Sequence, residues 1–170
     1  MISLILMICQ NQEGNVHKPK PIPVVAPTAL SVSELAAVCS QAETVIAKAV
    51  GIKVPGLRPK FRGNFATRSM IIAEFDRWFQ WTRPSFKSRP ADLVFDPKRL
   101  TVKDKSARAS LERLIGWGFV AKVGPLATNK VETVSLVDFG DALGLFLSRV
   151  ADLTHMPSSK FTPALQPPIK

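Results

Sequence analysis

The segment from residue 105 to residue 117 carries hydroxyl and guanidinium groups at regular intervals. Its sequence is KSARASLERLIGW, and its apolar residues recur at helical spacing, which predicts a helix over residues 106–117 with one polar side. A helix that enters the major groove of DNA needs small or hydrogen-bonding side chains near its N-terminus and cations beside them. On this pattern we expect base contacts from four residues, Ser106, Arg108, Ser110 and Arg113.

The positive charge of the chain is concentrated around this segment. The chain has 170 residues, with 23 Lys and Arg, 13 Asp and Glu, and a net charge of +10. Residues 58–130 contain 16 of the basic and 6 of the acidic residues, so the rest of the chain is neutral. Such a local excess of cations favours binding to nucleic-acid phosphates over a merely solvated basic surface. We expect phosphate contacts from Lys103, Lys105, Lys122, Lys130, Arg62 and Arg68.

Residues that commonly support catalysis or metal binding are sparse. His17 and His155, the two histidines, lie in or beside the proline-rich ends, and the chain has no Tyr. Cys9 and Cys39 have neither the spacing of a metal site nor that of a disulfide framework. The sequence also lacks a glycine-rich phosphate loop. We therefore expect no enzyme activity, no metal ion and no cofactor.

Two helices are expected before the basic loop that starts at residue 83. Over residues 31–51, Ser31 and Glu34 have the spacing of a capping box, Gly51 is a stop signal, and the apolar residues form a continuous stripe. Over residues 67–82, the aromatic side chains either stack on unpaired bases or pack in a core, and their helical spacing favours the core. These aromatic residues are Trp78, Phe79 and Trp81.

The helix 106–117 is expected to follow a shorter helical element. Asp96 and Pro97 predict a helical turn, because proline suits the first position of a helix. Ser106 is a candidate N-cap of the longer helix. Gly118 is expected to follow that helix with a positive φ, as glycine often does after a helix C-terminus.

The next part of the chain predicts a β-hairpin and a last long helix. Strands are expected at 118–124 and 129–137, joined by a short polar loop. The helix is expected at 138–156, with Asp138 as its N-cap and a wide apolar stripe. The complete order is helix, turn, helix, glycine, strand, loop, strand, helix, which is the order of a winged helix-turn-helix.

Two passages resemble known DNA-binding proteins. The passage LERLIGWGFVAKVG looks like the junction of helix, glycine and hydrophobic strand in the winged-helix superfamily. The passage VETVSLVDFGDAL resembles the junction of MarR-type transcriptional regulators in which a Leu-Thr-x-x-Gly segment opens the dimerisation helix, with Val137 here in place of the Thr. The resemblance covers about residues 67–154. It implies a mainly α fold with a small β-hairpin (α+β), a winged helix-turn-helix flanked by N- and C-terminal helices.

The same resemblance implies a function and a partner. The protein would be a sequence-specific transcriptional regulator that binds double-stranded DNA, with the helix 106–117 in the major groove. It would form a homodimer through helices 31–50 and 138–154, and no particular effector is indicated. Two alternatives remain open. One is a basic structural or RNA-binding component of a nucleoprotein assembly, and the other is a DNA-binding protein of a plasmid or phage replication system.

Both ends of the chain are rich in proline. We expect flexible tails over 1–30 and 157–170, on either side of a winged-helix domain over 31–156. The first nine residues are apolar, but they are too few to span a membrane, and they lack the basic start and cleavage site of a secretory signal. We therefore expect a cytoplasmic protein without a membrane segment.

Overall fold

The computed structural model describes residues 28–56 and 60–165, and this part of the chain is mainly α-helical, as predicted. None of its helices is long and apolar enough to cross a membrane. Most of the N-terminal tail predicted over 1–30 lies outside the described residues. The helices are α1 (Val32–Val50), α2 (Arg68–Thr82), α3 (Lys105–Gly116) and α4 (Leu136–Thr154), and the 3-10 turns are η1 (Arg83–Ser85), η2 (Pro97–Arg99), η3 (Ser158–Lys160) and η4 (Thr162–Leu165).

Several local signals in the sequence set the helix ends that we predicted. Ser31 and Glu34 form the expected capping box of α1, and Gly51 ends the helix with φ 79°. The turn η2 begins with Pro97, and the side chain of Asp96 accepts a hydrogen bond from the backbone N–H of Lys98. Gly118 follows α3 with φ 77°, a backbone conformation that residues with a Cβ rarely adopt. These four predictions are confirmed.

Two predicted N-caps are wrong by a few residues. The N-cap of α3 is Asp104 and not Ser106, because the Asp104 carboxylate accepts a hydrogen bond from the N–H of Ala107 at 2.7 Å. The N-cap of α4 is Ser135 and not Asp138. Asp138 instead stands in the first turn, where its N–H donates to Ser135 Oγ at 3.1 Å. In both places an earlier polar side chain has the spacing that a cap requires.

The predicted β-hairpin is wrong, because residues 118–124 and 129–137 do not pair with each other as strands in the structure. The first of these segments leads into successive turns, in which the N–H of Thr128 donates to the carbonyl of Gly124 at 2.9 Å. The second segment bonds elsewhere, through isolated antiparallel bridges from Thr133 to Thr67 and from Ser135 to Ala29, and its last two residues already belong to α4. The described residues therefore contain neither of the two predicted strands.

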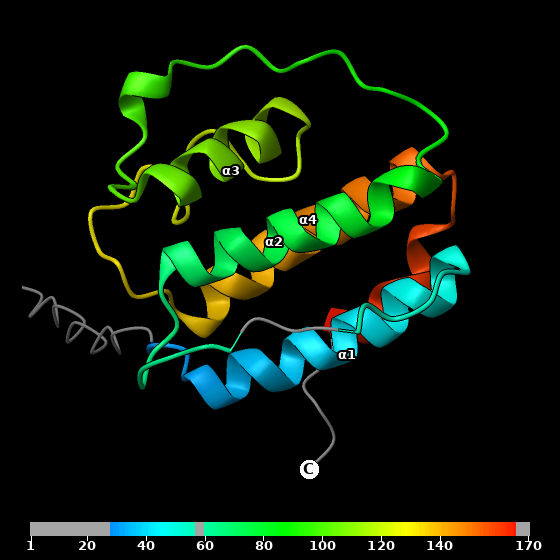
Figure 1. The fold of residues 1–170 in the computed structure, drawn as a ribbon, viewed down its shortest axis with the longest axis horizontal. Coiled ribbons are helices and arrows are strands. Elements are labelled where there is room, and N and C mark those ends of the chain that lie inside the picture. The colour runs from blue at the N-terminus through cyan, green and yellow to red at the C-terminus, as the bar shows by residue number, and fades with distance from the viewer. Residues whose placement is uncertain (1–27, 57–59, 166–170) are drawn as a thin grey trace, which may run out of the picture.

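Three extended segments meet in a closed ring of backbone hydrogen bonds. The N–H of Leu30 donates to the carbonyl of Val134 at 2.9 Å, Val134 donates to Ala66 at 3.2 Å, and Ala66 donates back to Leu30 at 2.8 Å. All three residues are buried, and each directly precedes the N-cap of α1, α2 or α4. The three helices consequently begin at the same end of the bundle and run side by side in the same direction (Figure 1).

Helix α3 runs in that direction too, on the side of α2 that faces away from α1 (Figure 1). Arg68 at the start of α2 bonds to Thr101, just before α3, and Phe79 near the end of α2 contacts Trp117, just after α3. The N-termini of all four helices therefore point toward one end of the molecule. The partial positive charge that each helix N-terminus carries adds up at that end.

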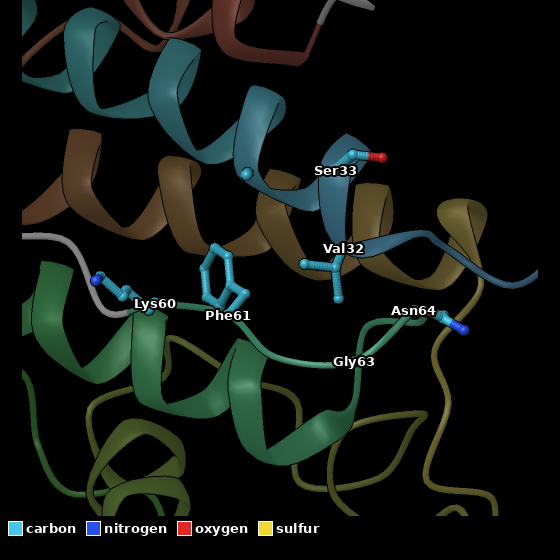
Figure 2. A pocket seen from close by; sticks show the side chains of 7 residues that line it. Val32, Ser33, Lys60, Phe61, Gly63 and Asn64 are labelled. Atoms are coloured by element: carbon cyan, nitrogen blue, oxygen red, sulfur yellow. The ribbon is translucent and has the colours of Figure 1, made fainter.

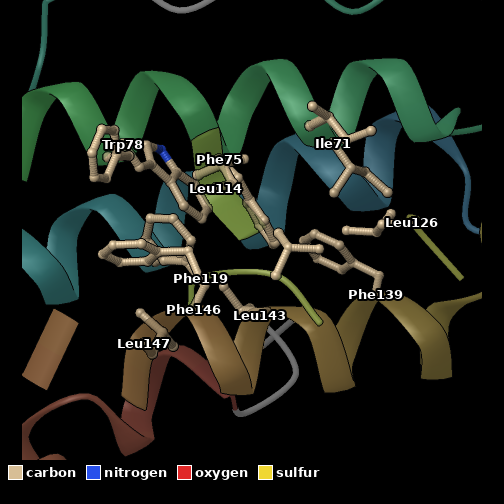
Figure 3. Close-up of a cluster of buried hydrophobic side chains, with 14 of the residues drawn as sticks. Ile71, Phe75, Trp78, Leu114, Phe119, Leu126, Phe139, Leu143, Phe146 and Leu147 are labelled. Carbon is tan, nitrogen blue, oxygen red and sulfur yellow. The ribbon is translucent and has the colours of Figure 1, made fainter. Parts of the chain in front are cut away.

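Aromatic side chains fill the space between α2, α3 and α4 (Figure 3). Phe75 lies 4.9 Å from Phe146 between ring centroids, and Phe119 lies 4.8 Å from the same ring. Trp78 and Phe79 are fully buried. Core packing, the preferred interpretation of these two residues, is confirmed, and they are not available to stack on bases.

A buried group of charged residues joins α1 to α2. Arg77 pairs with Glu43 of α1 and with Glu74 of its own helix, and both carboxylates are buried. The indole N–H of Trp78 also donates to Glu43, at 3.1 Å. Desolvation by burial lowers the pKa of Arg77, and Coulombic interaction with Cys39 opposes that shift.

The apolar stripes of α1 and α4 are covered within one chain. Leu35 and Ile46 of α1 are fully buried, as are Phe146 and Val150 of α4. Part of the cover comes from residues 158–165, which lie in the predicted flexible tail over 157–170. They form η3 and η4 instead, with Phe161 and Ala164 buried and the carbonyl of Pro163 accepting a hydrogen bond from Gln41 at 2.6 Å.

Candidate nucleic-acid interface

Helix α3 presents a polar side, as predicted, but two of its four predicted base-contacting residues face α2. Arg113 of α3 forms two hydrogen bonds with the carboxylate of Asp76, from Nε at 2.9 Å and from Nη2 at 3.1 Å. Ser110 donates to the same carboxylate at 3.0 Å. A guanidinium and a hydroxyl therefore surround one anionic group, which is also how such side chains bind a phosphate.

The other two predicted base-contacting residues lie nearer the start of α3. Arg108 donates from Nη2 to the carbonyl of Pro97 at 2.6 Å and pairs with Glu112 at 3.3 Å. Its side chain is still 37 % exposed, so it can exchange these partners for others. Ser106 is exposed and has no hydrogen bond to another described residue through its side chain. The four residues do lie on one helix, but their surroundings differ. Ser110 and Arg113 bond to α2, Arg108 bonds to the turn η2, and the Ser106 side chain has no partner among the described residues.

Arg68, a predicted phosphate contact, is buried. Its side chain is 1 % exposed, and it donates to Thr101 Oγ1 at 2.7 Å, to the carbonyl of Asn129 at 2.5 Å and to Glu132 at 2.9 Å. These bonds connect the start of α2 to the segments before α3 and before α4. We assign Arg68 a structural role and leave it out of the candidate interface.

The segments that Arg68 joins carry exposed cations. Thr101 also bonds to the 127–129 segment through its N–H, which donates to the carbonyl of Ala127 at 3.1 Å, so residues 97–105 and 127–132 lie together beside the start of α3. The segment 60–66 reaches the same end through the hydrogen-bonded ring. None of their lysines and arginines other than Arg68 forms an ion pair within the described residues. We call six of these exposed residues the basic end: Arg62, Lys98, Arg99, Lys103, Lys105 and Lys130.

The acidic residues in the segments of the basic end are bound to other groups. Asp96 caps η2, Asp104 caps α3, and Glu132 pairs with Arg68. Each of these carboxylates is hydrogen-bonded to the backbone or to a buried guanidinium, so none of them pairs with an exposed lysine. The cations at this end therefore remain available to an anionic partner, and the helix N-termini beside them favour the same sign of partner.

Lys122, the last predicted phosphate contact, is exposed but lies in different surroundings. Its neighbours Ala121 and Gly124 line a pocket of about 230 Å³ against α4, together with Asp138 and Asp141. Two carboxylates make this pocket unsuitable for a phosphate. Of the predicted phosphate contacts, the structure brings together Arg62, Lys103, Lys105 and Lys130. Lys122 lies apart from them, and Arg68 lies among them but is buried.

A larger, open pocket of about 650 Å³ lies beside Arg62, between the first turns of α1 and the 60–64 segment (Figure 2). Val32 and Phe61 are turned toward this space from the two sides, and Lys60 is the one cation among the residues that line it. The lining is otherwise apolar or neutral, so the pocket adjoins the basic end and adds only one positive charge to it.

One further group of residues has no signal in the sequence. Arg83 and Arg89, from the loop after α2, both lie over the ring of Trp117, which follows α3. They are separated from Trp117 by about 30 residues of chain, so no local pattern joins them. The sequence shows only the cations themselves, as part of the basic segment.

The described residues contain no group of three or more His, Cys, Asp or Glu side chains that could hold a metal ion. No protein-family model, no curated protein and no solved structure was found to match the chain.

Proposed function

We propose that the protein binds double-stranded DNA with the basic end, and that α3 lies in the groove while the lysines beside it contact phosphates. One observation carries this proposal. Six exposed cations, none with an acidic partner among the described residues, come from segments far apart in the sequence and gather at the end of the bundle where four helix N-termini point. A regular row of phosphates is the partner that both features favour.

In this proposal α3 acts as the recognition helix without a wing hairpin. The residues that flank α3 come from the 97–103 and 127–132 segments, which take the place that the wing has in a winged helix. In the role of a sequence-specific regulator, α3 reads base edges through Ser106 and Arg108 first, because Ser110 and Arg113 must exchange Asp76 for a base. The apolar stripes of α1 and α4 are buried within one chain, so a dimer that reads a two-fold site must use other surfaces.

The same internal contacts favour a second candidate function, a structural component of a nucleoprotein assembly that binds without sequence preference. Three of the four predicted base-contacting side chains already have partners within the chain. Cations at the basic end bind phosphates equally well in any sequence.

Selection from a pool of random DNA duplexes, repeated at two salt concentrations, tests the proposal and distinguishes its two forms. A compact consensus, lost when Arg108 is replaced by Ala, supports the regulator. Salt-sensitive binding without a consensus supports the structural component. If the protein retains no duplex even at low salt, the proposal itself is wrong.

A further inference from the structure

A second cationic surface lies at the opposite end of the bundle, where α2 and α3 end. The guanidinium carbon of Arg83 lies 5.7 Å from the centroid of the Trp117 ring, and that of Arg89 lies 5.8 Å from it. Lys87, between them in the sequence, is exposed. We call these four residues, Arg83, Lys87, Arg89 and Trp117, the Arg–Trp patch.

The core holds the Trp117 ring in place. The ring meets Phe79 edge to face, with 5.1 Å between centroids, and it lies 6.0 Å from Phe86. The carbonyl of Trp117 accepts a hydrogen bond from Arg149 Nε at 2.9 Å. The loop that carries the arginines is also anchored, because the N–H of Lys87 donates to the carbonyl of Leu153 at 2.7 Å. The aromatic platform is thus rigid before any ligand binds.

The arginines on this platform remain accessible. Arg83 is exposed and has no ion pair with a described residue. The side chain of Arg89 is 74 % exposed, and its one acidic neighbour, Asp92, is 3.9 Å away. An arginine that rests on an aromatic ring keeps its outer face and its N–H edge free, and its conformation is already restricted.

Planar guanidinium and indole groups beside free cations are the means by which proteins bind unpaired nucleotides. Unpaired bases stack on aromatic rings and on guanidinium planes, while lysine and arginine contact the phosphates. A duplex hides the faces of its bases and offers this patch only its phosphates. We propose that the Arg–Trp patch binds single-stranded nucleic acid, DNA or RNA, by stacking and phosphate contact. This second site goes beyond the duplex binding proposed for the basic end and lies at the other end of the helices.

The test compares the wild-type protein with two double variants, Arg83→Gln with Arg89→Gln, and Arg83→Lys with Arg89→Lys. Fluorescence anisotropy measures binding to a labelled 12-nucleotide thymidine strand, the corresponding uridine strand and a 20-base-pair duplex. Both variants are expected to lose about tenfold or more in single-strand affinity, because lysine keeps the charge and loses the planar stacking surface. Duplex affinity is expected to stay within about threefold of the wild type.

Replacement of Trp117 by Phe gives an independent measurement. The wild-type tryptophan fluorescence should be quenched by the single strand, and most of the quenching should disappear in this variant. Of the other two tryptophans, Trp78 is buried, and Trp81 is half-buried with its indole N–H bonded to the carbonyl of Lys53. Circular dichroism checks that each variant is folded. If the Trp117→Phe variant does not fold, the two arginine variants, whose replaced side chains are exposed, still test the proposal. Unchanged single-strand binding by the glutamine variant overturns the proposal, as does lysine-variant binding equal to wild type, which indicates charge alone. A difference in affinity between the thymidine strand and the uridine strand shows whether DNA or RNA is preferred.

The two proposals fail in different ways. Wild-type protein that binds the single strand and not the duplex contradicts the function of the basic end and leaves the Arg–Trp patch standing. Wild-type protein that binds the duplex and not the single strand contradicts the proposal for the Arg–Trp patch and is consistent with the function proposed for the basic end. Failure to bind either nucleic acid contradicts both.

Discussion

At the scale of residues, the structure separates cations that have an internal anion from cations that have none. Arg113 shares the carboxylate of Asp76 with Ser110, and Arg68 is buried in a set of three hydrogen-bonding partners. Lys103 and Lys105 have no such partner among the described residues. All of these cations have the same charge in the sequence, and only their neighbours in space decide which of them can bind an external phosphate.

If α3 contacts DNA as proposed, Asp76 competes with DNA for Arg113, so removal of the Asp76 carboxylate should strengthen binding. We expect the Asp76→Asn variant to bind a 20-base-pair duplex several-fold more tightly, with a salt dependence that is steeper by about one phosphate contact. Asp141→Asn is the matched control, because Asp141 is exposed on α4 and pairs with no described cation. It makes the same change in net charge. Equal effects of the two variants would show that charge alone, and not the release of Arg113, alters binding.

Arg62 and Arg68 were both predicted to contact phosphate, and the structure gives them different roles. Replacement of Arg68 by Ala should lower the free energy of unfolding by about 2–3 kcal/mol, because the carbonyl of Asn129 and the hydroxyl of Thr101 lose a buried, charged donor. Replacement of the exposed Arg62 by Ala should change stability by less than about 0.5 kcal/mol and weaken duplex binding. Urea unfolding and a binding titration on the same two proteins measure both effects. The assignment is wrong if Arg62→Ala is the less stable variant.

At the scale of elements, the sequence predicted what local chemistry determines. The capping box of Ser31 and Glu34 and the positive φ of Gly118 depend on neighbours within four positions, and both are confirmed. The pairing of 129–137 depends on residues 29 and 67, which lie about 70–100 positions away. Two apolar segments joined by a short polar loop predict a hairpin but do not show which distant segments they bond to, so the predicted hairpin is wrong.

The candidate site shows the same limit. The concentration of charge indicates the segment in which we propose the interface, and the helix pattern predicted the polar side of α3. The role of Asp76 and the stacking of Arg83 and Arg89 on Trp117 each join residues about 30 positions or more apart. No periodic pattern reports such contacts, because they depend on the parallel arrangement of α2 and α3.

The junction after α3 gives a prediction at the scale of elements. Gly118 has φ 77°, and a Cβ at this position would lie 3.3 Å from Arg149 Nε. We expect Gly118→Ala to lower stability by about 1–2 kcal/mol through backbone strain. Gly116, the last residue of α3, has open space where a methyl group would be added, with nothing within 4 Å, so Gly116→Ala is the control and should be neutral or slightly stabilising. Thermal unfolding of the two variants measures the difference, and an equal loss in both contradicts the assignment of strain to Gly118.

At the scale of the whole molecule, four parallel helices produce an asymmetric distribution of charge. The ring of hydrogen bonds between Leu30, Ala66 and Val134 aligns the starts of α1, α2 and α4, and Arg68 ties α3 to the same end. In the proposed function, the helix N-termini and the exposed lysines attract the phosphates of the duplex together at the basic end. The Arg–Trp patch lies where the helices end, so the two proposals place duplex and single-stranded nucleic acid on separate surfaces of one molecule.

The central claim is that the position of the lysines, and not the total charge, determines duplex binding. The most direct test compares Lys103→Glu, Lys105→Glu, Lys130→Glu with Lys48→Glu, Lys53→Glu, Lys160→Glu, because all six lysines are exposed and each triple variant changes the net charge equally. Binding to a 20-base-pair duplex is measured over a series of salt concentrations. We predict that the first variant loses about 100-fold or more in affinity and most of its salt dependence, while the second stays within about fivefold of the wild type. Equal losses in the two variants would contradict the account.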